Sequence, residues 1–157
     1  MNIQFFDYRK EVKNALKSQV AKFLEEAGGL VESKAKDNTR VESSQTKNSW
    51  THVVEGNRCT IGNPLENAVW EEYGTGEHSP KGRKGGWWIP ASILDSRTRN
   101  LLENKYKFKK HKDADTGEVF FFTIGKKGTE AFGKAWETCE PMVEARAKEI
   151  FGELNAK

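Results

Sequence analysis

Few side chains in this 157-residue chain have the types and spacing that chemistry requires. The histidines are His52, His78 and His111, and none has a second histidine or a cysteine at the spacing of metal ligands. Glu71 and Glu72 are a candidate acid and base, but adjacent residues of a helix point in different directions, so a solvated helix face explains them better. We therefore expect no catalytic residue, no metal site and no cofactor.

A phosphate-binding loop is the second chemical candidate, because Gly74-Thr75-Gly76 is rich in glycine. Such a loop needs the pattern Gly-x-x-x-x-Gly-Lys-Ser/Thr between a strand and a helix, and this chain lacks the pattern. Glycine is also the residue that most often ends a helix. The segment therefore predicts a helix C-cap.

Composition favours a folded protein with a wet surface. Hydrophobic residues make up 36% of the chain and charged residues 31%, and nine phenylalanines and five tryptophans argue against disorder. The net charge of +3 is too mild to indicate nucleic-acid binding by itself. Cys59 and Cys139 fit neither a metal site nor a disulfide framework, so we interpret them as small buried residues in a reducing compartment. No apolar run approaches the ~20 residues that span a membrane, and the first residues lack signal-peptide features.

Apolar periodicity then predicts the elements of the first half. Helical spacing from Phe5 and Tyr8 onward indicates one long helix to about Asp37, with Asp7 as N-cap and Gly28-Gly29 inside it. Residues 37–48 are polar and predict a loop, and residues 50–61 predict a hairpin with a Gly-Asn turn. Asn63 is expected to cap a short helix that starts at Pro64 and ends at Gly74. We expect Leu65, Ala68, Val69 and Tyr73 to share one face of this helix, with Trp70 beside it.

The second half predicts a flexible glycine-rich loop over residues 74–89, in which residues 87–89 begin a strand. Residues 91–103 predict a short helix, and residues 106–124 a second hairpin with its turn at 113–117. A last helix is expected from Phe132 to about Gly152, interrupted by Pro141. The whole is an α+β domain, with long N-terminal and C-terminal helices packed on a small antiparallel sheet built from two hairpins, and with a short central helix.

Two segments are candidates for binding nucleic acid. The loop 78–86 is basic and precedes two tryptophans, and residues 105–112 alternate lysine with aromatic residues. Basic groups beside aromatic rings can hold a nucleic-acid backbone and stack bases. A solvated loop and a lysine-protected edge strand are the alternative interpretation. The candidate contacts are Lys81, Arg83, Lys84, Lys109 and Lys110.

The segment 62–76 reads Gly-Asn-Pro-Leu-Glu-Asn-Ala-Val-Trp-Glu-Glu-Tyr-Gly-Thr-Gly, and we name it the signature segment. It resembles the strongest signature of the tail-completion, or head–tail connector, proteins of long-tailed double-stranded DNA phages. Further matches are the long helix over 8–37, the Thr-to-Ser linker 46–50, the loop 82–87, the turn at 113–125 and the helix from Phe132. The chain departs from the family pattern in two places, an expected insertion at 90–104 and a different lead, residues 127–132, into the last helix.

The resemblance implies a single connector-like domain over residues 1–157, without catalysis. Such a protein forms a ring of copies that joins head to tail, with head-closure, tail-terminator or tail-tube proteins as partners and transient contact with phage DNA. It would reside in the bacterial cytoplasm during assembly and then in the virion neck, and contact no membrane. A small nucleic-acid-binding module is the alternative function. The candidate interface residues, for which internal core is the other interpretation, are Trp70, Tyr73, Gly74, Thr75, Gly76, Trp87 and Trp88.

Overall fold

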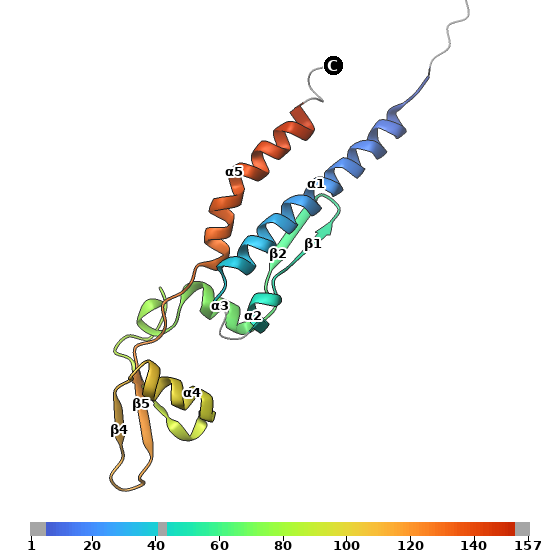
Figure 1. Ribbon diagram of the computed structural model, residues 1–157. Coiled ribbons are helices and arrows are strands. Elements are labelled where there is room, and N and C mark those ends of the chain that lie inside the picture. The colour runs from blue at the N-terminus through green and yellow to red at the C-terminus, as the bar shows by residue number, and fades with distance from the viewer. Residues whose placement is uncertain (1–5, 41–43, 153–157) are drawn as a thin grey trace, which may run out of the picture. The chain divides into compact units, whose positions relative to one another are not determined.

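The computed structural model describes residues 6–40 and 44–152 (Figure 1). It confirms the α+β class, with a long N-terminal helix, a C-terminal helix and two small antiparallel sheets. The helices are α1 (Arg9–Asn38), α2 (Ser44–Asn48), α3 (Glu66–Tyr73), α4 (Ser96–Asn100) and α5 (Ala131–Gly152). The strands are β1 (Thr51–Glu55), β2 (Arg58–Gly62), β3 (Trp87–Pro90), β4 (Lys110–Lys112) and β5 (Val119–Thr123).

The chain divides into two compact units. Unit 1 is formed by residues up to Ala68 together with residues from Glu130 onward, and unit 2 by Val69–Thr129. The boundary therefore falls inside α3. The sequence predicted a single domain over the whole chain, and the division into two compact units does not test that prediction.

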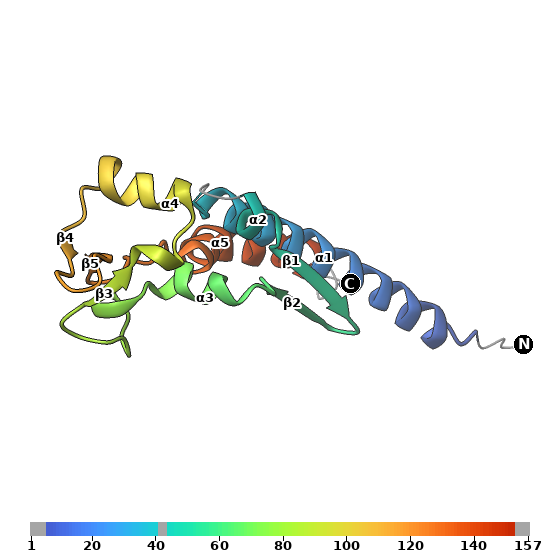
Figure 2. The ribbon, with the colours of Figure 1, turned by 90° about the horizontal axis from the view of Figure 1, so that it is seen from below.

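Unit 1 is built on α1, which packs against α5 and against the β1–β2 hairpin (Figures 1 and 2). The hairpin has the predicted Gly56-Asn57 turn, with Glu55 paired to Arg58. Small side chains in the core let the helices approach closely, since Ala35 on α1 and Ala135 on α5 are fully buried. The core cluster is Val31, Ala35, Trp50, Ala131, Ala135 and Cys139.

Helix α1 runs without a break through Gly28-Gly29, as predicted. It begins at Arg9, two residues after the predicted cap, and Asp7 Oδ1 accepts a hydrogen bond from the Arg9 amide at 3.1 Å. The apolar position predicted at Phe5 lies outside the described residues.

The loop predicted over 37–48 contains α2, and its residues 41–43 lie outside the described residues. Distant partners explain this short helix, because Thr46 accepts from Asn63 Nδ2 at its carbonyl (2.7 Å) and from Asn67 Nδ2 at its hydroxyl (3.1 Å). Pro141 was predicted to remove one backbone hydrogen bond and to kink the last helix. Helix α5 continues through Pro141, and its axis changes direction partway along (Figure 1).

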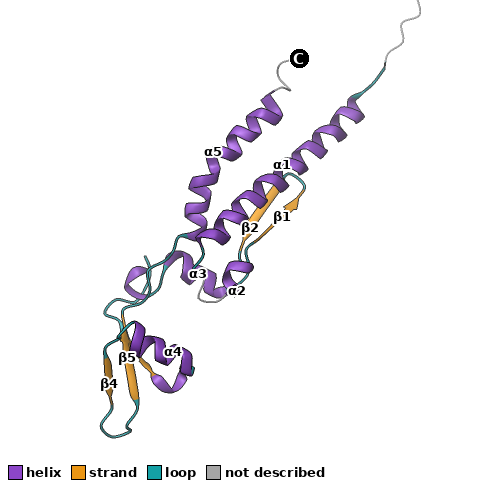
Figure 3. Cartoon of the chain, viewed as in Figure 1, coloured by secondary structure: helices purple, strands orange, loops and turns teal. Residues whose placement is uncertain are grey.

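Unit 2 contains a three-stranded antiparallel sheet in the order β3-β5-β4 (Figures 2 and 3). The prediction of one sheet from two hairpins was wrong in this respect, because the β1–β2 hairpin forms a separate sheet. Strand β4 starts at Lys110 and not at residue 106, since a π-helical turn, Leu101–Lys105, and a positive φ of 50° at Lys107 interrupt the extended backbone. Helix α4 is capped by Asp95, which accepts from the Thr98 amide at 2.9 Å.

His52 on β1 links the hairpin to α1 through two carboxylates. Its Nδ1 lies 2.6 Å from Glu32 Oε2 and its Nε2 lies 3.0 Å from Glu25 Oε2. Lys36 approaches the other oxygen of Glu32 at 2.5 Å. The Glu32 hydrogen bond, more than Glu25, raises the pKa of His52 above its ordinary value of 6.5 against the opposing effect of burial. Lys36, and then His52, lower the pKa of Glu32.

These pKa shifts predict that unit 1 loses stability as the pH rises above neutrality. Because the folded-state pKa of His52 is raised, the protonated ring stabilises the fold fully below about pH 6.5, and this contribution is lost as the pH rises through the folded pKa. Urea unfolding at pH 6 and pH 8 should show a lower midpoint at pH 8. The difference should shrink in a His52→Gln variant, and an unchanged difference would exclude His52 as its source.

Candidate interaction surfaces

The signature segment ends in a backbone crossing within unit 2, where residues 74–76 lie against residues 124–128. The amides of Thr75 and Glu77 donate to the carbonyls of Lys126 and Ile124, each at 2.8 Å. The Lys126 amide donates to Thr75 Oγ1 at 2.9 Å. In a phosphate-binding loop, the backbone amides are free to donate to the ligand. Here they donate to groups of the chain itself.

Glycine is required at this crossing by conformation and by space. Gly74 and Gly76 are buried, with φ of 79° and 58°. A Cβ on Gly76 would lie 2.3 Å from the Ile124 carbonyl oxygen, and one on Gly125 would lie 2.1 Å from the Thr75 carbonyl oxygen. The Gly74 amide donates to the Trp70 carbonyl at 2.9 Å, which confirms the predicted C-cap of α3. Gly74 and Gly76 of the signature segment thus have a role inside this chain.

Glu71 also belongs to this crossing. Its carbonyl accepts from the Thr129 amide at 2.6 Å and from Thr129 Oγ1 at 2.9 Å, and its Oε1 lies 2.5 Å from Lys126 Nζ. The side chain of Glu71 is largely buried, and its charge is paired with a lysine. The arrangement ties α3 to the segment that leads into α5.

The outer side of α3 is an exposed apolar surface, which we name the α3 face. Val69, Trp70 and Tyr73 are 58%, 53% and 61% exposed, and Glu66 lies on the same side at helical spacing. Of the residues predicted to share one face of this helix, Ala68 is buried, whereas Val69 and Tyr73 are exposed. The helix also begins later than predicted, at Glu66, and Asn63 Oδ1 accepts from the Leu65 amide in a turn before it.

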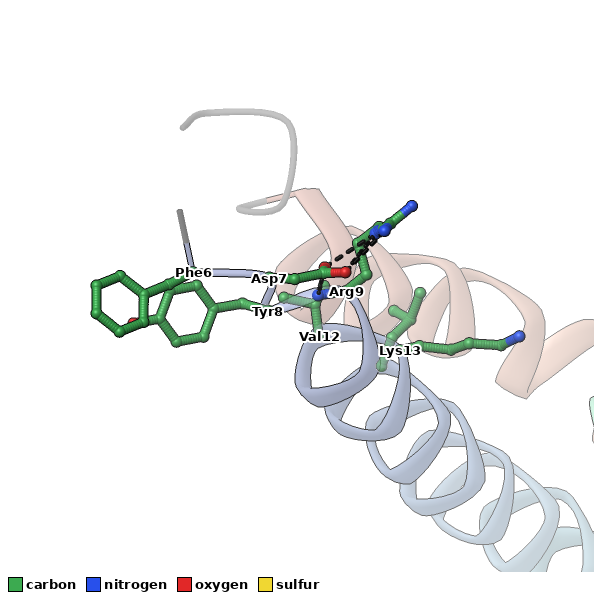
Figure 4. A pocket seen from close by; sticks show the side chains of 7 residues that line it. Phe6, Asp7, Tyr8, Arg9, Val12 and Lys13 are labelled. Carbon is green, nitrogen blue, oxygen red and sulfur yellow. Dashed lines mark hydrogen bonds and ion pairs between the residues drawn. The ribbon is translucent and has the colours of Figure 1, made fainter. Parts of the chain in front are cut away.

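The start of α1 carries a second exposed apolar surface, the N-terminal stripe, formed by Phe6, Tyr8, Val12 and Leu16. These side chains line a shallow open hollow together with Lys13 (Figure 4). All residues from 6 to 19 are exposed, so this part of the helix is solvated on every side. The flanking charges are mainly basic: Arg9, Lys10, Lys13 and Lys17, against Asp7 and Glu11.

The two neighbouring tryptophans of β3 have different surroundings. Trp87 is half-buried, and its ring lies so close to Gly76 that a Cβ there would approach Cζ3 to 2.7 Å. Trp88 points to the other side of the sheet, is 41% exposed, and contacts the rings of Phe122 and His111. Of the pair, Trp88 is therefore the one available for contact.

The predicted basic contacts all lie in unit 2, and each of them is exposed. Lys84 Nζ donates to the Glu77 carbonyl at 3.1 Å, and Lys110 pairs with Glu103 at 2.6 Å. Unit 2 has twelve lysines and arginines against eight aspartates and glutamates, so the positive excess of the chain resides there. Sequence reasoning identified these basic residues but missed the aromatic rings around Trp88. The available signal was that successive side chains of a strand point to opposite sides of a sheet, which places Phe120 and Phe122 on one side.

Both cysteines are free thiols, half-buried at Cys59 and buried at Cys139. Burial raises the pKa of each thiol, so both are poor nucleophiles near neutral pH. Within residues 6–40 and 44–152, no three acidic, histidine or cysteine side chains gather as metal ligands would. In the same ranges no helix has the length and apolarity needed to cross a membrane.

Comparison of the chain with protein-family models, with curated proteins and with solved structures finds no match.

Proposed function

We propose that this chain is a subunit of a phage head–tail connector ring, a tail-completion protein that acts by assembly. The observation that carries the proposal is the α3 face, on which Trp70 and Tyr73 are exposed although the helix beneath them is fixed by the backbone crossing. Exposed tryptophan and tyrosine on a rigid element are typical anchors of protein interfaces. The resemblance of the signature segment to connector proteins supports the same function.

The charges on the two apolar surfaces favour contact between different surfaces of neighbouring copies. The charged residue of the α3 face is Glu66, and helix α3 has no basic residue, whereas Lys13 and Lys17 flank the N-terminal stripe. Pairing the stripe with itself would bring these lysines together, while pairing it with the α3 face joins opposite charges. A contact between two different surfaces generates a ring when its rotation closes. We therefore propose that the N-terminal stripe of one copy binds the α3 face of the next.

Mixing two variants tests this arrangement. Trp70→Gln with Tyr73→Gln removes the α3 face, and Val12→Gln with Leu16→Gln removes the stripe. In sedimentation velocity, the wild type should associate with rising concentration, and each variant alone should stay monomeric, since losing one anchor weakens association about 30-fold or more. An equimolar mixture should form a dimer and nothing larger, because only one intact pair of surfaces remains.

Trp136→Gln is the matched control, since Trp136 is an exposed tryptophan of α5 outside both surfaces. It should associate as the wild type does. Raising the salt from 50 to 500 mM should weaken association, because screening reduces the attraction between exposed charges. Larger species formed by either variant alone would contradict the pairing.

The connector function itself is tested in virions. Phage lacking this protein should accumulate unjoined heads and tails, which added wild-type protein should join and the α3-face variant should not. Complete virions formed without the protein would overturn the proposed function.

A further inference from the structure

One side of the unit 2 sheet collects aromatic side chains from all three strands. The register places Trp88 of β3 opposite Phe122 of β5, and Phe120 of β5 opposite His111 of β4. The Trp88 ring centroid lies 5.2 Å from that of Phe122 and 5.9 Å from that of His111. We name these four residues the aromatic sheet face. Trp88 and His111 are exposed, and Phe120 and Phe122 are half-buried.

The opposite side of the same sheet supplies the core. Phe121, which alternates with Phe120 and Phe122, is 1% exposed. It lines a pocket together with Ala91 and with Arg99 and Glu103 from the helical segment between β3 and β4. The buried apolar side chains of this sheet thus lie on the side of Phe121, and the exposed Trp88 ring lies on the opposite side of the sheet.

Two basic segments border the aromatic sheet face. The basic loop ends at Gly86, where a Cβ would come within 2.6 Å of Phe122 Cζ, so the loop that carries Arg83 and Lys84 meets the sheet beside this ring. On the β4 side, the Phe122 amide donates to the Lys109 carbonyl at 2.8 Å, which sets Lys109 next to the same residue. The face therefore has aromatic rings at its centre and a basic segment of the chain on each of two sides.

We propose that the aromatic sheet face binds single-stranded nucleic acid, with bases stacked on Trp88 and His111 and phosphates held by Arg83, Lys84 and Lys109. Unpaired bases offer the flat surfaces that exposed rings stack on, and every base has one, so binding needs no sequence preference. A duplex hides those surfaces within its own stack. The inference is independent of the proposed connector function, because it uses neither the α3 face nor the N-terminal stripe.

Fluorescence anisotropy of labelled 15-mers of oligo(dT) and oligo(rU), with a 15-base-pair duplex beside them, tests the proposal at 50 mM salt. The wild type should bind both single strands at least tenfold more tightly than the duplex. Equal affinity for dT and rU indicates recognition of base and phosphate alone, and a preference for one identifies the strand bound. Absence of saturable binding to either, or tighter binding to the duplex, would overturn the proposal.

Matched variants separate stacking from charge. Trp88→Leu should weaken binding about tenfold or more. Trp136→Leu replaces a tryptophan that is equally exposed, at 41%, in the other unit, and should leave affinity unchanged. Combining Arg83→Gln, Lys84→Gln and Lys109→Gln, all surface changes, should reduce the slope of log affinity against log salt by about 2, since each phosphate contact on a single strand contributes about 0.7. An unchanged slope would overturn the assignment of these cations.

Independence from assembly is checked with the variant that lacks the α3 face. It should bind oligo(dT) as tightly as the wild type, while Trp88→Leu should associate with itself normally. Failure of one proposal therefore leaves the other standing, and loss of both functions in one variant would show that the two surfaces are not separate.

Discussion

Replacing Gly76 with alanine is expected to unfold the backbone crossing of unit 2. Two costs combine at this position. A φ of 58° costs an alanine about 1–2 kcal/mol, and its Cβ would lie 2.3 Å from the Ile124 carbonyl oxygen, which belongs to backbone and cannot rotate away. Relieving the contact would break the Glu77–Ile124 hydrogen bond. We expect a loss of at least about 4 kcal/mol in the free energy of unfolding, among the largest effects of a single substitution.

Gly85→Ala is the matched control for this prediction. Gly85 lies in the same unit with a φ of 83°, but nothing lies within 4 Å of the point that a Cβ would occupy there. It should therefore show the conformational cost alone, about 1–2 kcal/mol. Urea unfolding together with hydrogen exchange of the Thr75 and Lys126 amides would measure both variants. Equal losses in the two variants would show that the crossing adds nothing beyond backbone strain.

The second large effect is expected at Gly28, where alanine should destabilise unit 1 although alanine is the better helix former. A Cβ on Gly28 would lie 2.6 Å from both Cys59 Sγ and His52 Cδ2, so the hairpin would have to move away from α1. Overpacking of this kind costs about 1–3 kcal/mol, and displacement of His52 also weakens its bonds to Glu25 and Glu32. These costs exceed the gain of about 1 kcal/mol in helix propensity.

The neighbouring Gly29 gives the opposite expectation. The nearest atom to a Cβ there is His52 Cε1 at 3.8 Å, an ordinary contact, so Gly29→Ala should raise the free energy of unfolding by up to about 1 kcal/mol. Thermal and urea unfolding of the two single variants would give the two signs. In a His52→Ala background, Gly28→Ala should cost less. A stabilising Gly28→Ala would mean that the hairpin does not press on the helix at this point.

Local patterns predicted the elements whose causes are local. The Gly-Asn turn and its β-branched neighbours predicted the β1–β2 hairpin, and helical periodicity predicted α1 through two glycines, because these signals lie within one element. The α+β class followed from the order of such elements. The shortening of β4 did not, since it depends on a positive φ at Lys107 that lysine rarely adopts.

The candidate surfaces were harder to predict because exposure depends on distant partners. Periodicity placed Val69 and Tyr73 on one face with Ala68, but nothing in the sequence shows that the segment 124–129 reaches α3 through backbone groups. The same holds for Thr75, whose partner Lys126 is 51 residues away. Trp88 was predicted as a candidate interface residue, whereas its neighbours on the sheet became visible only with the register of β3, β4 and β5.

The bonds between Glu71 and Thr129 bear on how this protein can vary. They bring together the two ends of unit 2, because Glu71 lies near its first residue and Thr129 is its last. A segment whose two ends are held together can change length at small entropic cost, about 0.6 kcal/mol for each doubling of a flexible loop. Changes in the length of unit 2 should therefore have little effect on the folding of unit 1.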